Sequence, residues 1–178
     1  MNLLDRAGDR MVETVNPGGR SAPHVAAGVL VCLGVVAASA LLARRSEPGA
    51  YQRHLEREAG GDRGALSAVW PALFSITTLA ALRLWNAPSS PERTRALTLW
   101  GASQALNAAW MVVSPRLRLL ELAGGLATAA LTAAYAREAR RADARAGGMA
   151  APAAGLAIGN LVTGEVWRRS APAKPTLH

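Results

Sequence analysis

The sequence predicts an all-α integral membrane protein, a bundle of five transmembrane helices. Of its 178 residues, 51% are hydrophobic and only 4% aromatic, so alanine and leucine supply most of the apolar character. The charged residues cluster between long uncharged runs and do not recur among apolar residues at helical spacing. Uncharged runs of this kind are typical of membrane spans, which need about twenty residues. A soluble all-helical bundle is the alternative, because the later runs are so rich in alanine.

The first uncharged run, "AAGVLVCLGVVAASALLA", covers residues 26–43 and is closed by Arg44 and Arg45. Its eighteen residues are about the minimum for a membrane span. A polar segment precedes the run, and no short apolar region with a cleavage site accompanies it. These features argue against a secretory signal peptide.

Four further runs follow, each separated from the next by a break that is charged or contains proline or glycine. All five runs together define a membrane domain of residues 23–169, between an N-terminal extension of residues 1–22 and a C-terminal tail of residues 170–178. We expect this domain to lie in a bacterial inner membrane, either cytoplasmic or intracytoplasmic. The four later runs are residues 65–85, 96–113, 117–136 and 146–167.

The N-terminal extension has an amphipathic pattern. Leu4, Met11, Val12 and Val15 fall on one face of a helix, with the charged residues largely on the others. Such a segment is suited to a membrane surface or to a partner protein. A partly ordered tail is the alternative.

The formal net charge of +8 raises the question of a nucleic-acid partner. The basic residues lie at the ends of the predicted helices, which suits anionic lipid headgroups better than a duplex. Membrane lipids are therefore the expected partners, and no nucleic acid is expected. Because the basic residues divide almost evenly between the two sides, the positive-inside rule gives no orientation.

Groups that carry catalytic chemistry are scarce in the chain. His24, His54 and His178 lie outside the apolar runs, so no imidazole inside the bilayer is available to a haem or chlorophyll centre. The sequence has no metal-ligand cluster, nucleophile motif or glycine-rich phosphate loop, and its single cysteine is Cys32. A conventional catalytic centre is not predicted, so a non-enzymatic role is favoured.

Several polar and aromatic side chains lie inside the runs and could line one cavity. Trp70 and Phe74 share a helix face, and Gln104, Asn107 and Trp110 follow one another at intervals of three. An unpaired amide in hydrocarbon costs about 2–7 kcal/mol, so these amides must face protein, water or a ligand. Interhelical hydrogen bonding is the alternative for Asn107. The candidate ligand-binding residues are Trp70, Phe74, Gln104, Asn107, Trp110 and Tyr51.

Other residues are predicted to have packing or interface roles. Gly101, Ala105 and Ala109 recur every four residues, which would let another helix approach closely. Three tryptophans near run ends are expected to anchor at the membrane interface, and Arg83 is expected to snorkel beside one of them. The three are Trp85, Trp100 and Trp167.

The motifs resemble those of the translocator protein / tryptophan-rich sensory protein family, TspO/MBR. "VWPALF" matches at Val69, Trp70, Leu73 and Phe74, and "QALNAAW" matches at Gln104, Leu106, Asn107 and Trp110. Glu121 fits an acidic position early in the fourth helix, and Trp167 with Arg168 fits the end of the fifth. The resemblance spans roughly residues 24–169 and marks the chain as a divergent bacterial member.

The resemblance implies a five-helix bundle, often a dimer, with a cavity under the first loop. That cavity would bind a porphyrin, a haem-pathway intermediate or a sterol-like molecule, and relatives in purple bacteria affect the expression of pigment genes. The chain departs from the family before the second helix, where "GGDRGA" replaces a proline pair, and in the fifth helix. There, Gly155, Leu156 and Ile158 lie where aromatics are expected, and Thr163 replaces an asparagine.

Two functions are therefore expected. The first is binding of a tetrapyrrole, carotenoid or sterol-like ligand, with porphyrin or haem as the cofactor-like candidate, to regulate or traffic pigment and porphyrin metabolites. The second is a structural or assembly subunit of a larger membrane complex, such as a photosynthetic pigment-protein complex, in which the pocket has decayed. A homodimer or a larger complex is the expected assembly.

Overall fold

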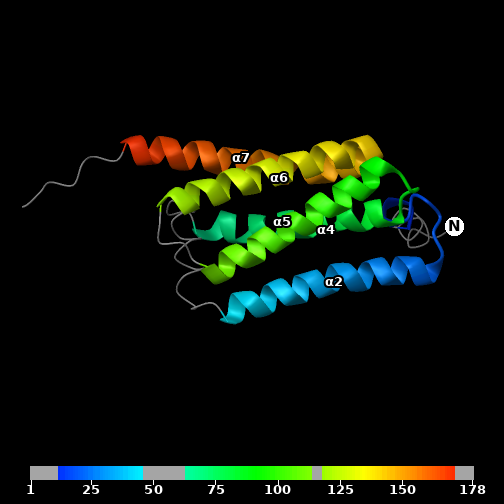
Figure 1. Cartoon of the computed structure of the whole chain (residues 1–178). Coiled ribbons are helices and arrows are strands. Elements are labelled where there is room, and N and C mark those ends of the chain that lie inside the picture. Colours follow the sequence, from blue (N-terminus) through cyan, green and yellow to red (C-terminus); the bar gives the residue numbers. More distant parts are fainter. Residues whose placement is uncertain (1–11, 46–62, 114–117, 171–178) are drawn as a thin grey trace, which may run out of the picture.

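The computed structural model describes residues 12–45, 63–113 and 118–170, where it forms an all-helical bundle without strands (Figure 1). Side chains are not described at residues 39–40, 43–45, 63–74, 110–113, 118–119, 121, 160–161 and 163–170. Each predicted run coincides with one long helix, so the all-α class is confirmed. The long helices are α2 (Ala22–Arg45), α4 (Arg63–Asn86), α5 (Pro91–Val113), α6 (Arg118–Ala142) and α7 (Ala144–Ser170).

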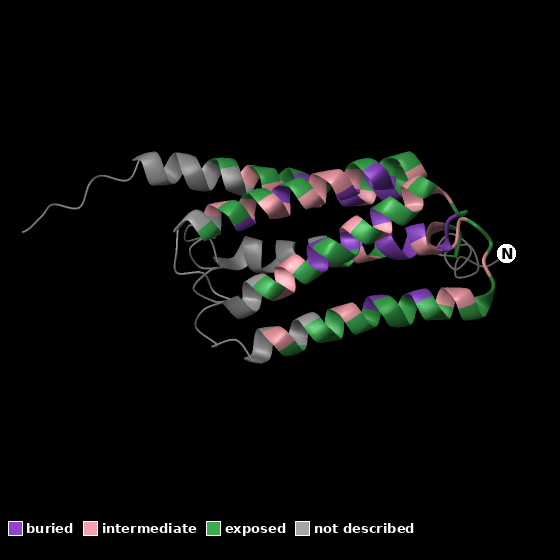
Figure 2. Ribbon diagram, viewed as in Figure 1, coloured by how far each residue is buried: buried purple, intermediate pink, exposed green. Residues whose placement is uncertain are grey.

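The packing of the helices follows the chain order only in part. α6 and α7 form an antiparallel pair joined through Asp143 alone, α5 packs against α6, and α4 packs against α7. α2 lies along one edge of the bundle against α4 and α5 (Figure 1). Its outer residues are exposed, with Leu30 at 69% and Leu33 at 58% of full exposure (Figure 2).

In residues 12–45, 63–113 and 118–170, no helix is at once long enough and apolar enough to qualify as a membrane span.

The core consists mainly of small side chains near the end of the bundle where α4 turns into α5 and α6 into α7. Ala80, Ala96, Ala139 and Ala146 are fully buried there, around the larger Tyr135. Figure 2 shows the buried residues concentrated in this part of α4 to α7. Small residues let the helix axes approach closely, which compensates for the scarcity of large apolar side chains.

α6 and α7 approach each other closely at Gly147. A Cβ built at this position would collide with the backbone and Cβ of Arg140. At the neighbouring Gly148, a Cβ would meet nothing within 4 Å. The close packing of α6 on α7 therefore requires a glycine at Gly147 but not at Gly148.

An N-terminal strap, residues 12–20, lies across the same end of the bundle. Its first residues form a helical turn, and Val15 packs on the core. Asn86 Nδ2 donates a 3.0 Å hydrogen bond to the carbonyl of Val15. Arg20 donates to the carbonyl of Ala87 at 3.1 Å. The described part of the extension is thus held against protein, whereas residues 1–11 fall outside the described part of the chain.

Arg83 on α4 forms hydrogen bonds both to the strap and to Asp143, the residue that precedes α7. Its Nε and Nη2 donate to the two carboxylate oxygens of Asp143 at 2.8 and 2.9 Å. Its Nη1 donates to the carbonyls of Glu13 and Thr14 at 3.2 and 2.6 Å. Only 5% of the residue is exposed. The expectation that Arg83 snorkels to the interface is therefore wrong, because the bidentate geometry and two strap carbonyls satisfy the guanidinium inside the protein.

Asp143 also caps α7, since the backbone N–H of Ala146 donates to its Oδ1 at 2.8 Å. The hydrogen bonds from Arg83 hold the pKa of Asp143 below its ordinary value, and the cap contributes in the same direction. One carboxylate therefore joins the start of α7 to the end of α4.

The depressed pKa of Asp143 predicts a stability change in acid. A carboxyl with a lowered folded pKa stabilises the protein fully above its unfolded pKa, about 3.9, and this contribution is lost as the pH falls through the folded value. We expect the stability difference between the wild type and Asp143→Asn to be constant from pH 7 to about pH 5 and to shrink below about pH 4. Thermal unfolding in detergent across this range measures it, and a difference that grows in acid would contradict the assignment.

Candidate functional site

The inner face of α5 carries a row of polar and aromatic side chains. Ser90 caps the helix by accepting a 3.0 Å hydrogen bond from the N–H of Arg93, and Pro91 occupies the first helical position. Beyond this start, Trp100, Gln104 and Asn107 recur at intervals of four and three and so share one face. Trp100 is 6% exposed, Gln104 is 8% exposed, and Asn107 is half-buried. We call these three residues the amide site.

Two buried polar atoms of the amide site have no hydrogen-bond partner among the described residues. They are Nε1 of Trp100, a donor, and Oε1 of Gln104, an acceptor. Burying such groups unpaired costs about 1–3 kcal/mol each, so native proteins rarely retain them without a ligand, water or function. Because donor and acceptor lie one turn apart, they could bind one molecule that carries both complementary groups.

The nearby hydroxyl groups are already engaged. Ser103 Oγ donates to the carbonyl of Trp100 at 2.7 Å, as serine often does within its own helix. Tyr135, almost fully buried on α6, donates to the carbonyl of Thr77 on α4 at 3.2 Å. The Tyr135–Thr77 contact ties α6 to α4 at the level of Trp100.

Two further predicted residues on α4, Trp70 and Phe74, lie at the same height along the bundle as the amide site. Trp70 lies sixteen residues before the end of α4, and Asn107 lies sixteen residues after the start of α5. Phe74 likewise lies twelve residues before the end of α4, close to the level of Gln104, which lies thirteen after the start of α5. Since α4 and α5 are antiparallel, each pair shares a height along the bundle.

Some predicted site residues fall outside what the structure describes. The side chains of Trp70 and Phe74 on α4 and of Trp110 on α5 are among those not described, as is that of Glu121 on α6. Tyr51 lies outside the described residues altogether. Of the six ligand-binding candidates, the described side chains are therefore those of Gln104 and Asn107, and the roles of all six stay predictions.

Sequence reasoning missed the role of Trp100. The expectation of an interface anchor is wrong, because the ring is buried in the core. In the sequence, the spacing of four residues between Trp100 and Gln104 indicates that the two side chains lie on the same face of the helix. Trp85, half-buried, packs against His24, with ring centroids 5.6 Å apart, and donates to the His24 carbonyl at 3.2 Å. The third predicted anchor, Trp167, has no described side chain.

The predicted packing stripe lies on the outer face of α5. Gly101, Ala105 and Ala109 are exposed, and a Cβ added at Gly101 would meet nothing within 4 Å. A close helix contact at this stripe is therefore not made by the described part of this chain. Such a contact would need a second molecule, and it stays a prediction.

The amide site carries groups that are suited to hydrogen bonding with a ligand. The site offers the indole N–H of Trp100, the amide oxygen of Gln104 and the half-buried amide of Asn107, with no titratable side chain among these three residues. In the described residues, no group of three or more histidine, cysteine, aspartate or glutamate side chains is placed to hold a metal ion. An arrangement of this kind suits a flat, largely apolar ligand with a few polar groups better than it suits a reaction.

Comparison with protein families supports the resemblance. The model of the TspO/MBR family matches residues 26–168, which is most of the chain. No curated protein matches the sequence. No solved structure matches the fold.

Proposed function

The chain belongs to the TspO/MBR family, a family of membrane proteins, and on this premise we propose that it binds a tetrapyrrole or a similar flat apolar ligand at the amide site. The observation that carries the proposal is the buried, unpaired donor and acceptor on Trp100 and Gln104. A tetrapyrrole offers a wide apolar face together with polar groups at its edge for hydrogen bonding. By this binding the protein would regulate or traffic pigment and porphyrin metabolites.

The bundle, we propose, spans the bacterial inner membrane with its five long helices. Large apolar side chains on the outer faces of several helices support this placement, because a lipid surround removes the cost of exposing them. They include Leu30 and Leu33 on α2, Leu79 on α4, Leu126 on α6 and Ile158 on α7.

Five spans place the two termini on opposite sides of the membrane. Reporter fusions after Arg20 and after Lys174 are expected to give opposite sidedness in bacterial cells. The same sidedness for both fusions would contradict five spans.

Ligand binding is tested by Gln104→Leu, which removes the unpaired acceptor and keeps the side chain large. We expect porphyrin affinity to fall about tenfold, the worth of one good hydrogen bond. The thermal stability of the ligand-free protein is expected to stay unchanged or to rise, because leucine removes the unpaired buried oxygen of Gln104. Fluorescence quenching gives the affinity and thermal unfolding in detergent gives the stability.

Two further variants control this experiment. Ala102→Leu adds the same side chain on the exposed side of α5 and is expected to change neither quantity. Asn107→Ala, at a half-buried position, is expected to weaken binding without loss of stability. If Gln104→Leu or Asn107→Ala lowered stability and left affinity intact, the amides would be packing groups. A role in assembly would then be favoured.

A further inference from the structure

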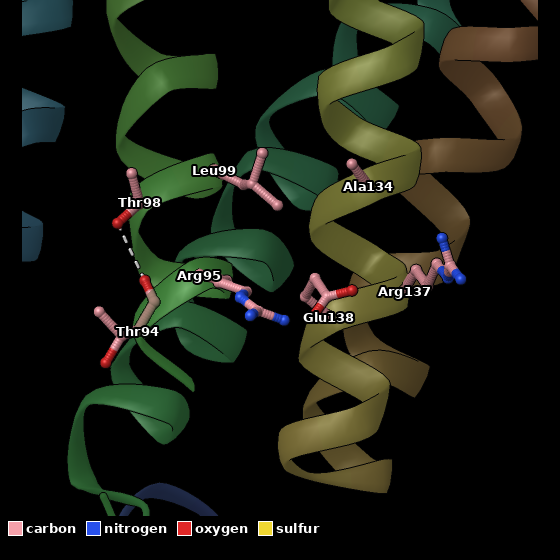
Figure 3. Close-up of a pocket in the computed structure, with 7 residues that line it drawn as sticks. All are labelled: Thr94, Arg95, Thr98, Leu99, Ala134, Arg137 and Glu138. Atoms are coloured by element: carbon pink, nitrogen blue, oxygen red, sulfur yellow. Dashed lines mark hydrogen bonds between the residues drawn. The ribbon is translucent and has the colours of Figure 1, made fainter. Parts of the chain in front are cut away.

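A second site of a different character lies between α5 and α6, outside the amide site. A groove of about 450 Å³ opens on the side of the bundle there (Figure 3). It begins one turn after the start of α5 and one turn before the end of α6. The residues that line it are Thr94, Arg95, Thr98, Leu99, Ala134, Arg137 and Glu138.

One cation and one carboxylate face each other across this groove. Figure 3 shows Arg95 extending from α5 toward Glu138 on α6, whereas Arg137 points to the other side of α6. In the described residues, no hydrogen bond or ion pair joins Arg95 to any side chain, so its guanidinium is available to a ligand. Arg95 is exposed at the mouth of the groove.

Glu138 supplies the second and independent observation. It is 9% exposed, and its Oε1 accepts a 2.7 Å bond from Arg141. Its other oxygen, Oε2, is buried and has no hydrogen-bond partner in the part of the chain that the structure describes. A carboxylate oxygen is a strong acceptor, and leaving it unpaired is costly, so Oε2 is suited to accept a hydrogen bond from a ligand in the groove.

We infer that this groove binds the headgroup of a phospholipid that carries an ammonium donor beside its phosphate, namely phosphatidylethanolamine. The phosphate would pair with Arg95, and the ammonium would donate to Oε2 of Glu138. Leu99 and Ala134 would lie against the apolar part of the lipid. The inference uses the proposed membrane placement but not the amide site.

The position of the groove favours a lipid over a free metabolite. Arg95 directly precedes the predicted span of residues 96–113, and Arg137 with Glu138 directly follows that of residues 117–136. These groups would thus lie at headgroup depth, with apolar helix surface continuing below them. Basic side chains collect at this end of the bundle, which suits a phosphate-bearing surface. They include Arg93, Arg140, Arg141 and Arg145.

The test is native mass spectrometry of the delipidated full chain, titrated with lipids of identical acyl chains. Phosphatidylethanolamine is expected to bind at least about tenfold more tightly than phosphatidylcholine, whose ammonium has no N–H. The N,N-dimethyl form retains one N–H and is expected to bind nearly as well as the parent lipid. Equal binding of the ethanolamine and choline lipids would overturn the proposal.

Variants identify the groove as the site of this preference. Glu138→Gln is expected to abolish the preference over phosphatidylcholine, and Arg95→Gln to weaken both lipids about tenfold. Arg140→Gln, in the neighbouring groove between α6 and α7, is the matched control and is expected to leave both unchanged. An Arg95→Gln protein that binds like the wild type would also overturn the proposal, because Arg95 then would not hold the phosphate.

Soluble phosphoethanolamine distinguishes the source of the headgroup. Binding of this compound alone as tight as that of the lipid would assign the groove to a free small molecule and overturn the lipid assignment. Porphyrin affinity of Arg95→Gln, measured by fluorescence quenching, is expected to equal that of the wild type. The lipid titrations test the groove and the porphyrin titrations test the amide site, so either proposal can fail without the other.

Discussion

Replacing Arg83 with leucine is expected to lower the free energy of unfolding by about 3 kcal/mol, the lower end of the range for breaking a buried ion pair. The guanidinium donates to both oxygens of Asp143 and to the carbonyls of Glu13 and Thr14. Leucine would remove the hydrogen bonds that Arg83 donates to the partly buried carboxylate and to the two strap carbonyls. Denaturant or thermal unfolding in detergent measures the loss, and faster hydrogen exchange in residues 12–20 should accompany it.

Two comparisons make this expectation specific. Arg95→Leu removes an exposed arginine that makes no ion pair in the described residues, and we expect a change within about 0.5 kcal/mol. The double variant Arg83→Leu/Asp143→Asn is expected to lose less than the sum of the two single variants, because neither charge is left alone. A loss in Arg83→Leu no larger than in Arg95→Leu would refute the role assigned to Arg83.

Gly147→Ala is expected to destabilise the bundle by about 2 kcal/mol or more, whereas Gly148→Ala should stabilise it by about 0.5–1 kcal/mol. At Gly147 the new methyl group would meet the backbone of Arg140, which yields only if α6 and α7 move apart. At the exposed Gly148 the methyl group meets no atom within 4 Å. Alanine there stabilises the protein because it lowers the conformational entropy of the unfolded chain. Both variants add one methyl group, and they differ only in the space that surrounds this group.

Melting temperatures of the two glycine variants, measured in one detergent, provide the comparison. We expect shifts of opposite sign relative to the wild type. Shifts of the same sign would mean that the helix pair is not packed as closely at Gly147 as its contacts indicate.

Local sequence determined the helices and the phase of α5. The uncharged runs and the charged or proline- and glycine-bearing breaks predicted all five long helices, because helix formation depends on neighbours within a few residues. The same local geometry placed Gln104 and Asn107 on one face of α5. The family motifs predicted the match over residues 26–168 for the same reason, since they are short patterns carried within single helices.

Only the tertiary structure decided which partners lie across those helices. Arg83 and Asp143 are sixty residues apart, and their pairing depends on how α4 meets the start of α7. Trp100 looked like an interface anchor because its position near the end of a run is a local property, whereas its burial follows from the packing of α5 on α6. The unpaired oxygen of Glu138 is likewise invisible in sequence, because it reflects which donors neighbouring helices fail to supply. A short helical pattern fixes the direction of a side chain, but the rotation and depth of each helix in the bundle decide what that side chain meets.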